Sequence, residues 1–97
     1  MKRIASERQI ETAAIMLRAL ADPARLNTLI RLAERERSVT ELADITGEKI
    51  ATISARLKVL FTARLVKRRR DGQNIRYSLT DAHVLNLIRN AVDHASH

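Results

Sequence analysis

Four side chains near the C-terminal end have the types and the spacing of metal ligands, and they include every histidine in the sequence: Asp81, His83, His94 and His97. The segment from Thr80 to His97 predicts one helix. His83 and His94 are eleven positions apart, about three turns, so they share a face but lie roughly 16 Å apart along the axis. A zinc–nitrogen bond is only about 2 Å long. One ion therefore cannot join His83 and His94 of the same helix.

A second, antiparallel copy of this helix would complete the site. If two copies pair about a two-fold axis, the start of one helix lies beside the end of the other. Each end then collects Asp81 and His83 from one chain with His94 and His97 from the second, which predicts two sites per dimer. One carboxylate and three imidazoles suit tetrahedral Zn(II), with Co(II) as an alternative. Because this shell leaves no position for a catalytic water, we expect a structural or sensory site and no enzyme.

The alternative is that the three histidines are ordinary solvated side chains, above all His97 at the terminus, where helices fray. An apolar stripe between the two ligand pairs favours the metal interpretation, because it gives this helix a face on which to pair. The stripe consists of Val84, Leu87, Ile88, Ala91 and Val92.

Capping residues and apolar spacing predict the elements that precede this helix. Four helices are expected, over residues 8–20, 23–35, 39–46 and 49–62. Asp22 caps the second, and Pro23 takes its first helical position. Ser38 and Glu41 form a capping box for the third. Gly47 fits the tight turn between the third helix and the fourth.

Two helices joined by a tight glycine turn form a helix-turn-helix, whose second helix enters the major groove of DNA. On the helix over 49–62 the spacing predicts a core face formed by Ile50, Ile53, Leu57 and Leu60. Small and polar residues are expected to face outward: Lys49, Thr52, Ser54, Arg56 and Lys58. Arg56 is the one that we expect to reach a guanine or a phosphate.

A basic β-hairpin is predicted directly after this helix, because Asp71-Gly72 separates two short extended runs. A charged edge strand also protects against aggregation, but four consecutive basic residues exceed that need. Beside a helix that reads the groove, such a hairpin would contact the phosphate backbone, and these contacts weaken with salt. Its candidate DNA-binding residues are Lys67, Arg68, Arg69, Arg70 and Gln73.

Length, charge and composition narrow the class of protein. The 97 residues predict a single domain over 1–97, and the net charge of +7 favours nucleic acid over a membrane as the partner. The absence of cysteine excludes disulfides and thiol redox sensing. No apolar run is long enough to cross a bilayer and the start lacks a signal-peptide core, so a cytoplasmic location is expected. The sequence offers no nucleophile–base pair, so no small-molecule substrate is expected.

The sequence resembles the ArsR/SmtB family of metal-responsive winged-helix repressors over nearly its whole length. The segments that carry the resemblance are residues 19–26, 54–60, 65–67, 70–73 and 76–84. The four candidate ligands match the pattern Asp-x-His, ten residues, His-x-x-His of the zinc- and cobalt-sensing branch. Two departures stand out. Residues 41–45 lack the Cys-x-Cys of arsenic, cadmium and lead sensors, and Lys49-Ile50-Ala51 stands where relatives often have Ser-Gln-Ser.

The resemblance implies a mostly helical winged helix-turn-helix homodimer, with about five helices, a two-stranded wing, and dimerisation helices at both ends of the chain. It also implies that the metal-free dimer binds a two-fold DNA operator. Zn(II), or Co(II), at two ions per dimer, then lowers the DNA affinity and releases genes for metal efflux or storage. His94 is expected to donate its second ring N–H to a backbone carbonyl near Arg64.

Three other classes remain open. The first is a winged-helix DNA-binding regulator that responds to no metal and whose C-terminal histidines have no function; its DNA affinity would not change with zinc. The second is a metalloenzyme, which would show zinc-dependent hydrolysis. The third is a protein–protein adaptor, which would show no salt-sensitive DNA binding.

Overall fold

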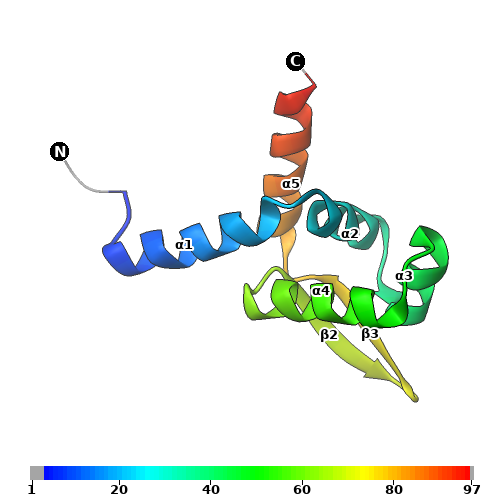
Figure 1. Ribbon diagram of the computed structural model, residues 1–97. Coiled ribbons are helices and arrows are strands. Elements are labelled where there is room, and N and C mark those ends of the chain that lie inside the picture. The colour runs from blue at the N-terminus through cyan, green and yellow to red at the C-terminus, as the bar shows by residue number, and fades with distance from the viewer. Residues whose placement is uncertain (1–3, 97) are drawn as a thin grey trace.

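The computed structural model describes residues 4–96, and within them five helices and three short strands follow one another as Figure 1 shows. The helices are α1 (Glu7–Leu20), α2 (Pro23–Glu34), α3 (Val39–Thr46), α4 (Ile50–Thr62) and α5 (Ala82–Ala95), and the strands are β1 (Arg37–Ser38), β2 (Val66–Asp71) and β3 (Asn74–Leu79). The predicted order of helices and hairpin is confirmed. His97, one of the predicted metal ligands, lies outside the described residues.

The helix ends follow the capping signals. The Asp22 side chain accepts the backbone N–H of Arg25, and Pro23 occupies the first turn of α2. Ser38 and Glu41 form the predicted capping box of α3. These side chains satisfy backbone N–H groups that have no partner inside their own helix, so the boundaries of α2 and α3 lie within a residue of those predicted.

The wing, which we define as β2, β3 and the turn between them, belongs to a sheet of three antiparallel strands in the order β1-β3-β2. Val66 pairs with Leu79 at its base and Asp71 with Asn74 at its tip, where Gly72 has a φ of +66°. The prediction of two strands was therefore incomplete. β1 contains only two residues, too few for the alternation that identifies a strand in a sequence.

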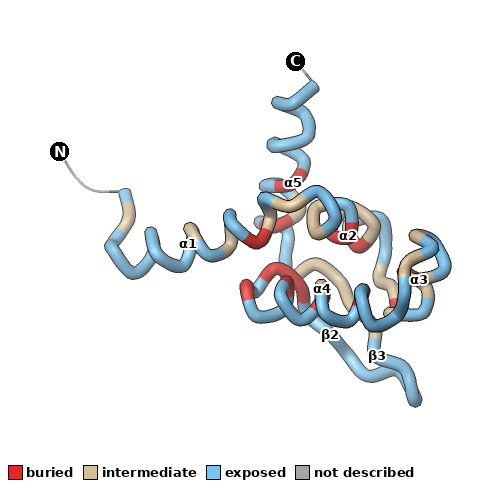
Figure 2. The backbone as a smooth tube through the Cα atoms, viewed as in Figure 1, coloured by how far each residue is buried: buried red, intermediate tan, exposed pale blue. Residues whose placement is uncertain are grey.

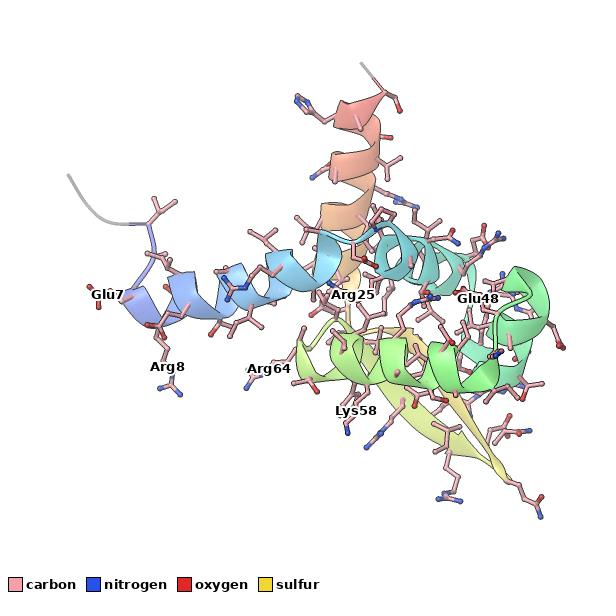
Figure 3. All side chains as sticks on the ribbon, in the orientation of Figure 1. Glu7, Arg8, Arg25, Glu48, Lys58 and Arg64 are labelled. Atoms are coloured by element: carbon pink, nitrogen blue, oxygen red, sulfur yellow. The ribbon has the colours of Figure 1, made fainter. Side chains whose placement is uncertain are left out.

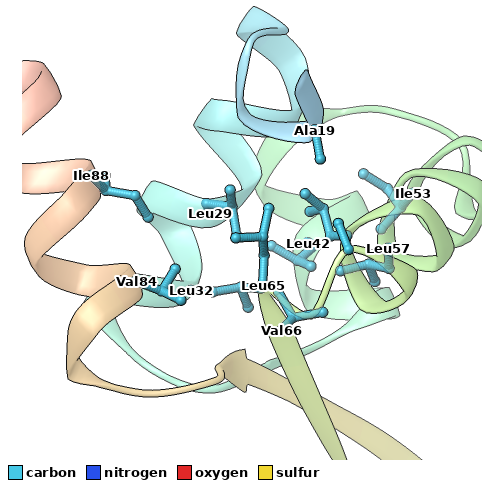
Figure 4. Packing of buried hydrophobic residues seen from close by; sticks show 12 residues of the cluster. Ala19, Leu29, Leu32, Leu42, Ile53, Leu57, Leu65, Val66, Val84 and Ile88 are labelled. Carbon is cyan, nitrogen blue, oxygen red and sulfur yellow. The ribbon is translucent and has the colours of Figure 1, made fainter. Parts of the chain in front are cut away.

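The core lies where α2, α3, α4 and the start of β2 meet, with Ala19 of α1 and Val84 and Ile88 of α5 packed into it, as Figure 4 shows. The fully buried apolar side chains are Leu29, Leu42, Ile53, Leu57, Leu60 and Leu65. One predicted core residue is wrong: Ile50 is 55% exposed. It stands in the first turn of α4, and an apolar period identifies a helix face without showing whether a neighbour covers it at every turn.

Helices α1 and α5 leave apolar side chains uncovered. Figures 1 and 2 show α1 extending from the body of the domain, mostly exposed, while α5 stands away from it in another direction. Ile10, Ile15 and Leu17 of α1 are about half exposed, and Leu87 and Val92 of α5 are more than a third exposed. The radius of gyration is 14.5 Å, whereas a compact domain of this length has about 12.5 Å. None of the described helices is both long and apolar enough to cross a membrane.

Candidate nucleic-acid interface and metal centre

The turn between α3 and α4 has the tight geometry that a helix-turn-helix requires. Gly47 ends α3 in the left-handed conformation, with a φ of +72°, and its N–H donates to the carbonyl of Ala43 over 2.8 Å. The hydroxyl of Thr46 donates to the carbonyl of Leu42 and accepts the N–H of Glu48. A residue with a Cβ is strained at this φ, which explains why glycine serves here.

Four of the five side chains predicted to face DNA from α4 are exposed, and they come from its N-cap and its first nine residues: Lys49, Thr52, Ser54 and Lys58. Figure 3 shows Lys58 on the side of α4 from which the wing projects, whereas Glu48 lies on the side towards α2. The N-cap Lys49 makes no side-chain capping bond. Exposed polar side chains therefore line α4 from its N-cap onward, and Lys58 lies on the side of the wing.

Arg56 departs from its prediction. Its guanidinium donates two hydrogen bonds to the carboxylate of Glu48, at 2.9 and 2.7 Å, and a third to the hydroxyl of Thr28 at 3.2 Å. Only 10% of its side chain is exposed. These bonds lower the pKa of Glu48, so the carboxylate stays ionised. Arg56 therefore ties α4 to α2 and to Glu48, two residues before α4, and it does not face outward to a base or phosphate.

The wing's basic side chains fall into two groups. Arg69 donates to both oxygens of Glu36, with a shortest distance of 2.7 Å. Arg76 is held between Glu41 at 2.7 Å and Asp71 at 2.8 Å. The Arg69 hydrogen bonds lower the pKa of Glu36, as the Arg76 bond does for Asp71. Two of the wing's cations are thus already neutralised.

The second group of wing side chains is open to an anionic partner. Lys67 and Arg70 are exposed, and neither makes an ion pair with any residue between 4 and 96. Arg68 lies over the ring of Phe61 on α4, 4.2 Å from its centroid, a cation–π contact that fixes the guanidinium against the outer surface of α4. Gln73 is exposed in the turn. The free positive charge of the wing therefore lies mainly on β2.

The predicted metal ligands occupy the two ends of α5. Asp81 is its N-cap: one carboxylate oxygen, Oδ1, accepts the N–H groups of His83 and Val84. The Val84 bond is the main reason that the pKa of Asp81 is lowered. The same Oδ1 lies 3.6 Å from Nδ1 of His83, whose side chain is almost fully exposed. His94 is exposed near the other end of α5.

This donor set fits a divalent ion of the zinc type, because it offers an ionised carboxylate beside an accessible imidazole. Within the part of the chain that the structure describes, no three histidine, aspartate or glutamate side chains come close enough to hold a metal. The four-ligand site remains a prediction that requires a second copy of the chain.

Arg64, near which the carbonyl acceptor of His94 is expected, lies close to the Asp81 end of α5. The carbonyl of Arg64 accepts a hydrogen bond from the hydroxyl of Thr80 over 2.8 Å. A surface hollow of about 240 Å³ is lined by Arg64 together with Asp81 and His83. His94 makes no such bond within residues 4–96, and the bond expected for it therefore also requires a second chain.

Three sets of contacts could not be found by sequence reasoning. Glu36 and Arg69 are 33 positions apart, and Glu41 and Arg76 are 35 apart. No sequence signal near Glu36 or Glu41 indicates that these acids pair with arginines of the wing. The Glu48–Arg56 pair is separated by eight, a spacing outside the three or four positions at which helical side chains meet.

Comparison with known proteins places this geometry among bacterial regulators. A sequence profile described as "Bacterial regulatory protein, arsR family" matches residues 22–68. The chain is 43% identical over 86 residues to a transcriptional repressor SmtB homolog of Synechocystis, which covers 89% of this chain and 65% of that protein. It is 40% identical to the HTH-type transcriptional regulator NmtR of Mycobacterium tuberculosis, over 87% of this chain and 70% of that one.

A solved structure shares the fold. The homodimeric winged helix-turn-helix DNA-binding domain from Mycobacterium bovis, described as a possible ArsR-family transcriptional regulator, superimposes with a TM-score of 0.89 at 31% identity. The match covers 99% of this chain and 91% of that domain. The fold of the chain is therefore a winged helix-turn-helix, as predicted.

Proposed function

We propose that this chain, which belongs to the arsR family of bacterial regulatory proteins, is a metal-responsive transcriptional repressor that binds operator DNA as a homodimer. The observation that carries the proposal is the surface made by α4 and the wing. Lys49, Thr52, Ser54 and Lys58 are exposed on α4 and its N-cap, and Lys67 and Arg70 of β2 are exposed and make no ion pair with any described residue. Such a surface suits base edges in the major groove and the phosphates that flank it.

The homodimer is supported by the uncovered apolar side chains of α1 and α5. Ile10, Ile15 and Leu17 of α1 are about half exposed, and Leu87 and Val92 add to the apolar surface of α5. A soluble domain covers so much apolar surface with a partner. We propose that this partner is a second copy of the chain. The relative from Mycobacterium bovis is described as homodimeric, and a dimer matches the two-fold symmetry of operators.

The metal site that we propose is shared between the two chains. Asp81 and His83 of one chain would act with His94 and His97 of the second, giving two equivalent sites per dimer. Zn(II) is the proposed ion, with Co(II) as the alternative, because the donors are nitrogen and oxygen and no thiolate is available. Bound metal supplies a cross-link between the two copies of α5.

The response to metal follows from linkage. If metal lowers the affinity for DNA by some factor, DNA lowers the affinity for metal by the same factor. Asp81 and His83 stand at the start of α5, next to Arg64 at the end of α4. Holding the two chains through these residues would change the spacing of the two copies of α4, which must fit half-sites about 34 Å apart. The repressor would then release efflux or storage genes.

The test is DNA affinity by fluorescence anisotropy on a two-fold operator fragment from the protein's own promoter. It is measured at fixed salt with and without one zinc per chain, for the wild type, His94→Asn and the control Asn86→Ala. Asn86 is exposed on α5 within one turn of His83 and is not one of the proposed ligands. We expect zinc to weaken DNA binding of the wild type and of the control, but not of His94→Asn.

A second candidate, a winged-helix regulator that responds to no metal, makes the opposite prediction. DNA binding that is tight, sensitive to salt and unchanged by zinc in all three proteins would favour it. The same result would reduce Asp81 to its role as the cap of α5.

A further inference from the structure

The end of α4 is an unusual point in the backbone. Arg64 has a φ of +63°, and it is the one described residue other than glycine with a positive φ. A residue with a side chain is strained in this left-handed region, so surrounding contacts must hold Arg64 there. The Leu65 N–H donates back to the carbonyl of Leu60, and that of Arg64 donates to the carbonyl of Phe61. The direction in which α4 leads into the wing is therefore set at this residue.

Thr80 holds this junction from the other side of the fold. Its hydroxyl donates to the carbonyl of Arg64 over 2.8 Å, and its backbone N–H donates to the carbonyl of Leu65 over 3.2 Å. Sixteen positions separate Thr80 from Arg64. Two hydrogen bonds thus join the segment between β3 and α5 to the segment between α4 and β2.

Thr80 is also the residue directly before Asp81, which caps α5 and is the first of the proposed ligands. Asp81 is therefore joined to Arg64, two residues beyond the end of α4, through the peptide bond to Thr80 and the hydrogen bond of the Thr80 side chain. Arg64, Asp81 and His83 also line one surface hollow of about 240 Å³.

We propose that Thr80 is a positioning residue, whose hydroxyl transmits the state of the Asp81–His83 end of α5 to the recognition helix through the carbonyl of Arg64. This inference rests on the proposed function, because it assigns a route to the coupling between metal and DNA. Moving Asp81 moves Thr80, and the hydroxyl then pulls on or releases the strained residue that ends α4. The backbone bond from Thr80 to Leu65 alone would leave the carbonyl of Arg64 free to turn.

The experiment compares Thr80→Val, which keeps the shape but loses the hydroxyl, with Thr80→Ser, which keeps the hydroxyl. For each protein the DNA affinity is measured with and without zinc, and zinc affinity is measured in the absence of DNA. We expect Thr80→Val to bind DNA without metal and zinc without DNA nearly as the wild type does. Its zinc-induced loss of DNA affinity should be about 3- to 10-fold smaller, the value of one hydrogen bond. Thr80→Ser should restore it.

A second readout needs no metal. Amide hydrogen exchange in the segment 63–65 should be faster in Thr80→Val than in the wild type or Thr80→Ser. Without the hydroxyl of Thr80 on the carbonyl of Arg64, this segment should open more often and expose its N–H groups to water. Thr80→Ala serves in the same way if the valine variant unfolds.

The outcomes separate the two claims. A wild type that ignores zinc overturns the proposed function, and the inference falls with it. A wild type that responds to zinc while Thr80→Val responds equally leaves the function standing and shows that Thr80 is not the route. A purely structural role would lower stability and leave the ratio of the two DNA affinities unchanged.

Discussion

The two kinds of arginine on β2 should affect DNA binding very differently. Arg70 is exposed and makes no ion pair with the described residues, whereas both oxygens of Glu36 already accept hydrogen bonds from the guanidinium of Arg69. We expect Arg70→Ala to remove a phosphate contact and so to weaken DNA binding. Arg69→Ala should change the DNA affinity little. Glu36→Gln leaves Arg69 in place but unneutralised, so it should strengthen DNA binding.

The magnitude follows from counterion release. Each phosphate contact contributes about 0.9 to the slope of log K against log salt concentration. If Arg70 makes one contact in each half-site, a dimer of Arg70→Ala loses about 1.8 from that slope. Between roughly 50 and 200 mM salt, the wild type should then weaken about 12-fold more than the variant. The slope for Glu36→Gln should instead be steeper, by up to about 1.8.

The assay is fluorescence anisotropy at four or more salt concentrations with one operator fragment and metal-free protein. Non-specific DNA of equal length is the control, because the loss of a phosphate contact should weaken protein binding to both duplexes alike. Equal slopes for Arg69→Ala and Arg70→Ala would refute the argument that Glu36 withdraws Arg69 from the interface. So would a slope for Glu36→Gln no steeper than that of the wild type.

Three further changes test the framework around this surface. Gly47→Ala should lower the free energy of unfolding by about 1 kcal/mol in urea titrations, because alanine is strained at a φ of +72°. Arg56→Ala should lower the thermal midpoint through the lost Glu48 and Thr28 bonds, yet leave the salt slope of DNA binding unchanged; a reduced slope would return Arg56 to the interface. The Ser38 N–H, followed by Arg76, lowers the pKa of Glu41 from 4.5 to about 2. The stabilisation by ionised Glu41 is therefore complete above pH 4.5 and is lost as the pH falls towards 2. Thermal midpoints measured from pH 6 to 2.5 should accordingly fall further for the wild type than for Glu41→Gln, which retains an amide acceptor for the cap; parallel curves would show that Glu41 does not cause the loss.

Local signals predicted the fold well because they act over a few residues. The caps at Asp22 and Ser38 and the turn glycines Gly47 and Gly72 each appear in the structure as expected. The match of the C-terminal segment to a ligand pattern also lies within one helix, although the site itself stays a prediction.

The errors came from contacts between distant segments. Apolar spacing placed Ile50 in the core, but only the packing of neighbouring elements determines which turn of α4 is covered. Arg56 was assigned to DNA by its place on a helix surface, and the acid that turns it inward precedes that helix by two residues. Charge in a sequence shows how many cations exist, while ion pairs across the fold decide which of them remain available to a partner.

The uncovered faces of α1 and α5 have a consequence for how the protein must be handled and how it would behave in a cell. Partner association stabilises only the folded chain, so the stability of a protein that works as a pair rises with its own concentration. Dilution below the dissociation constant of the dimer would separate the copies and abolish operator binding with no ligand present. Under the proposed function, the number of protein copies is thus a second input beside metal, and a cell that makes few of them would lose repression even when the metal is scarce.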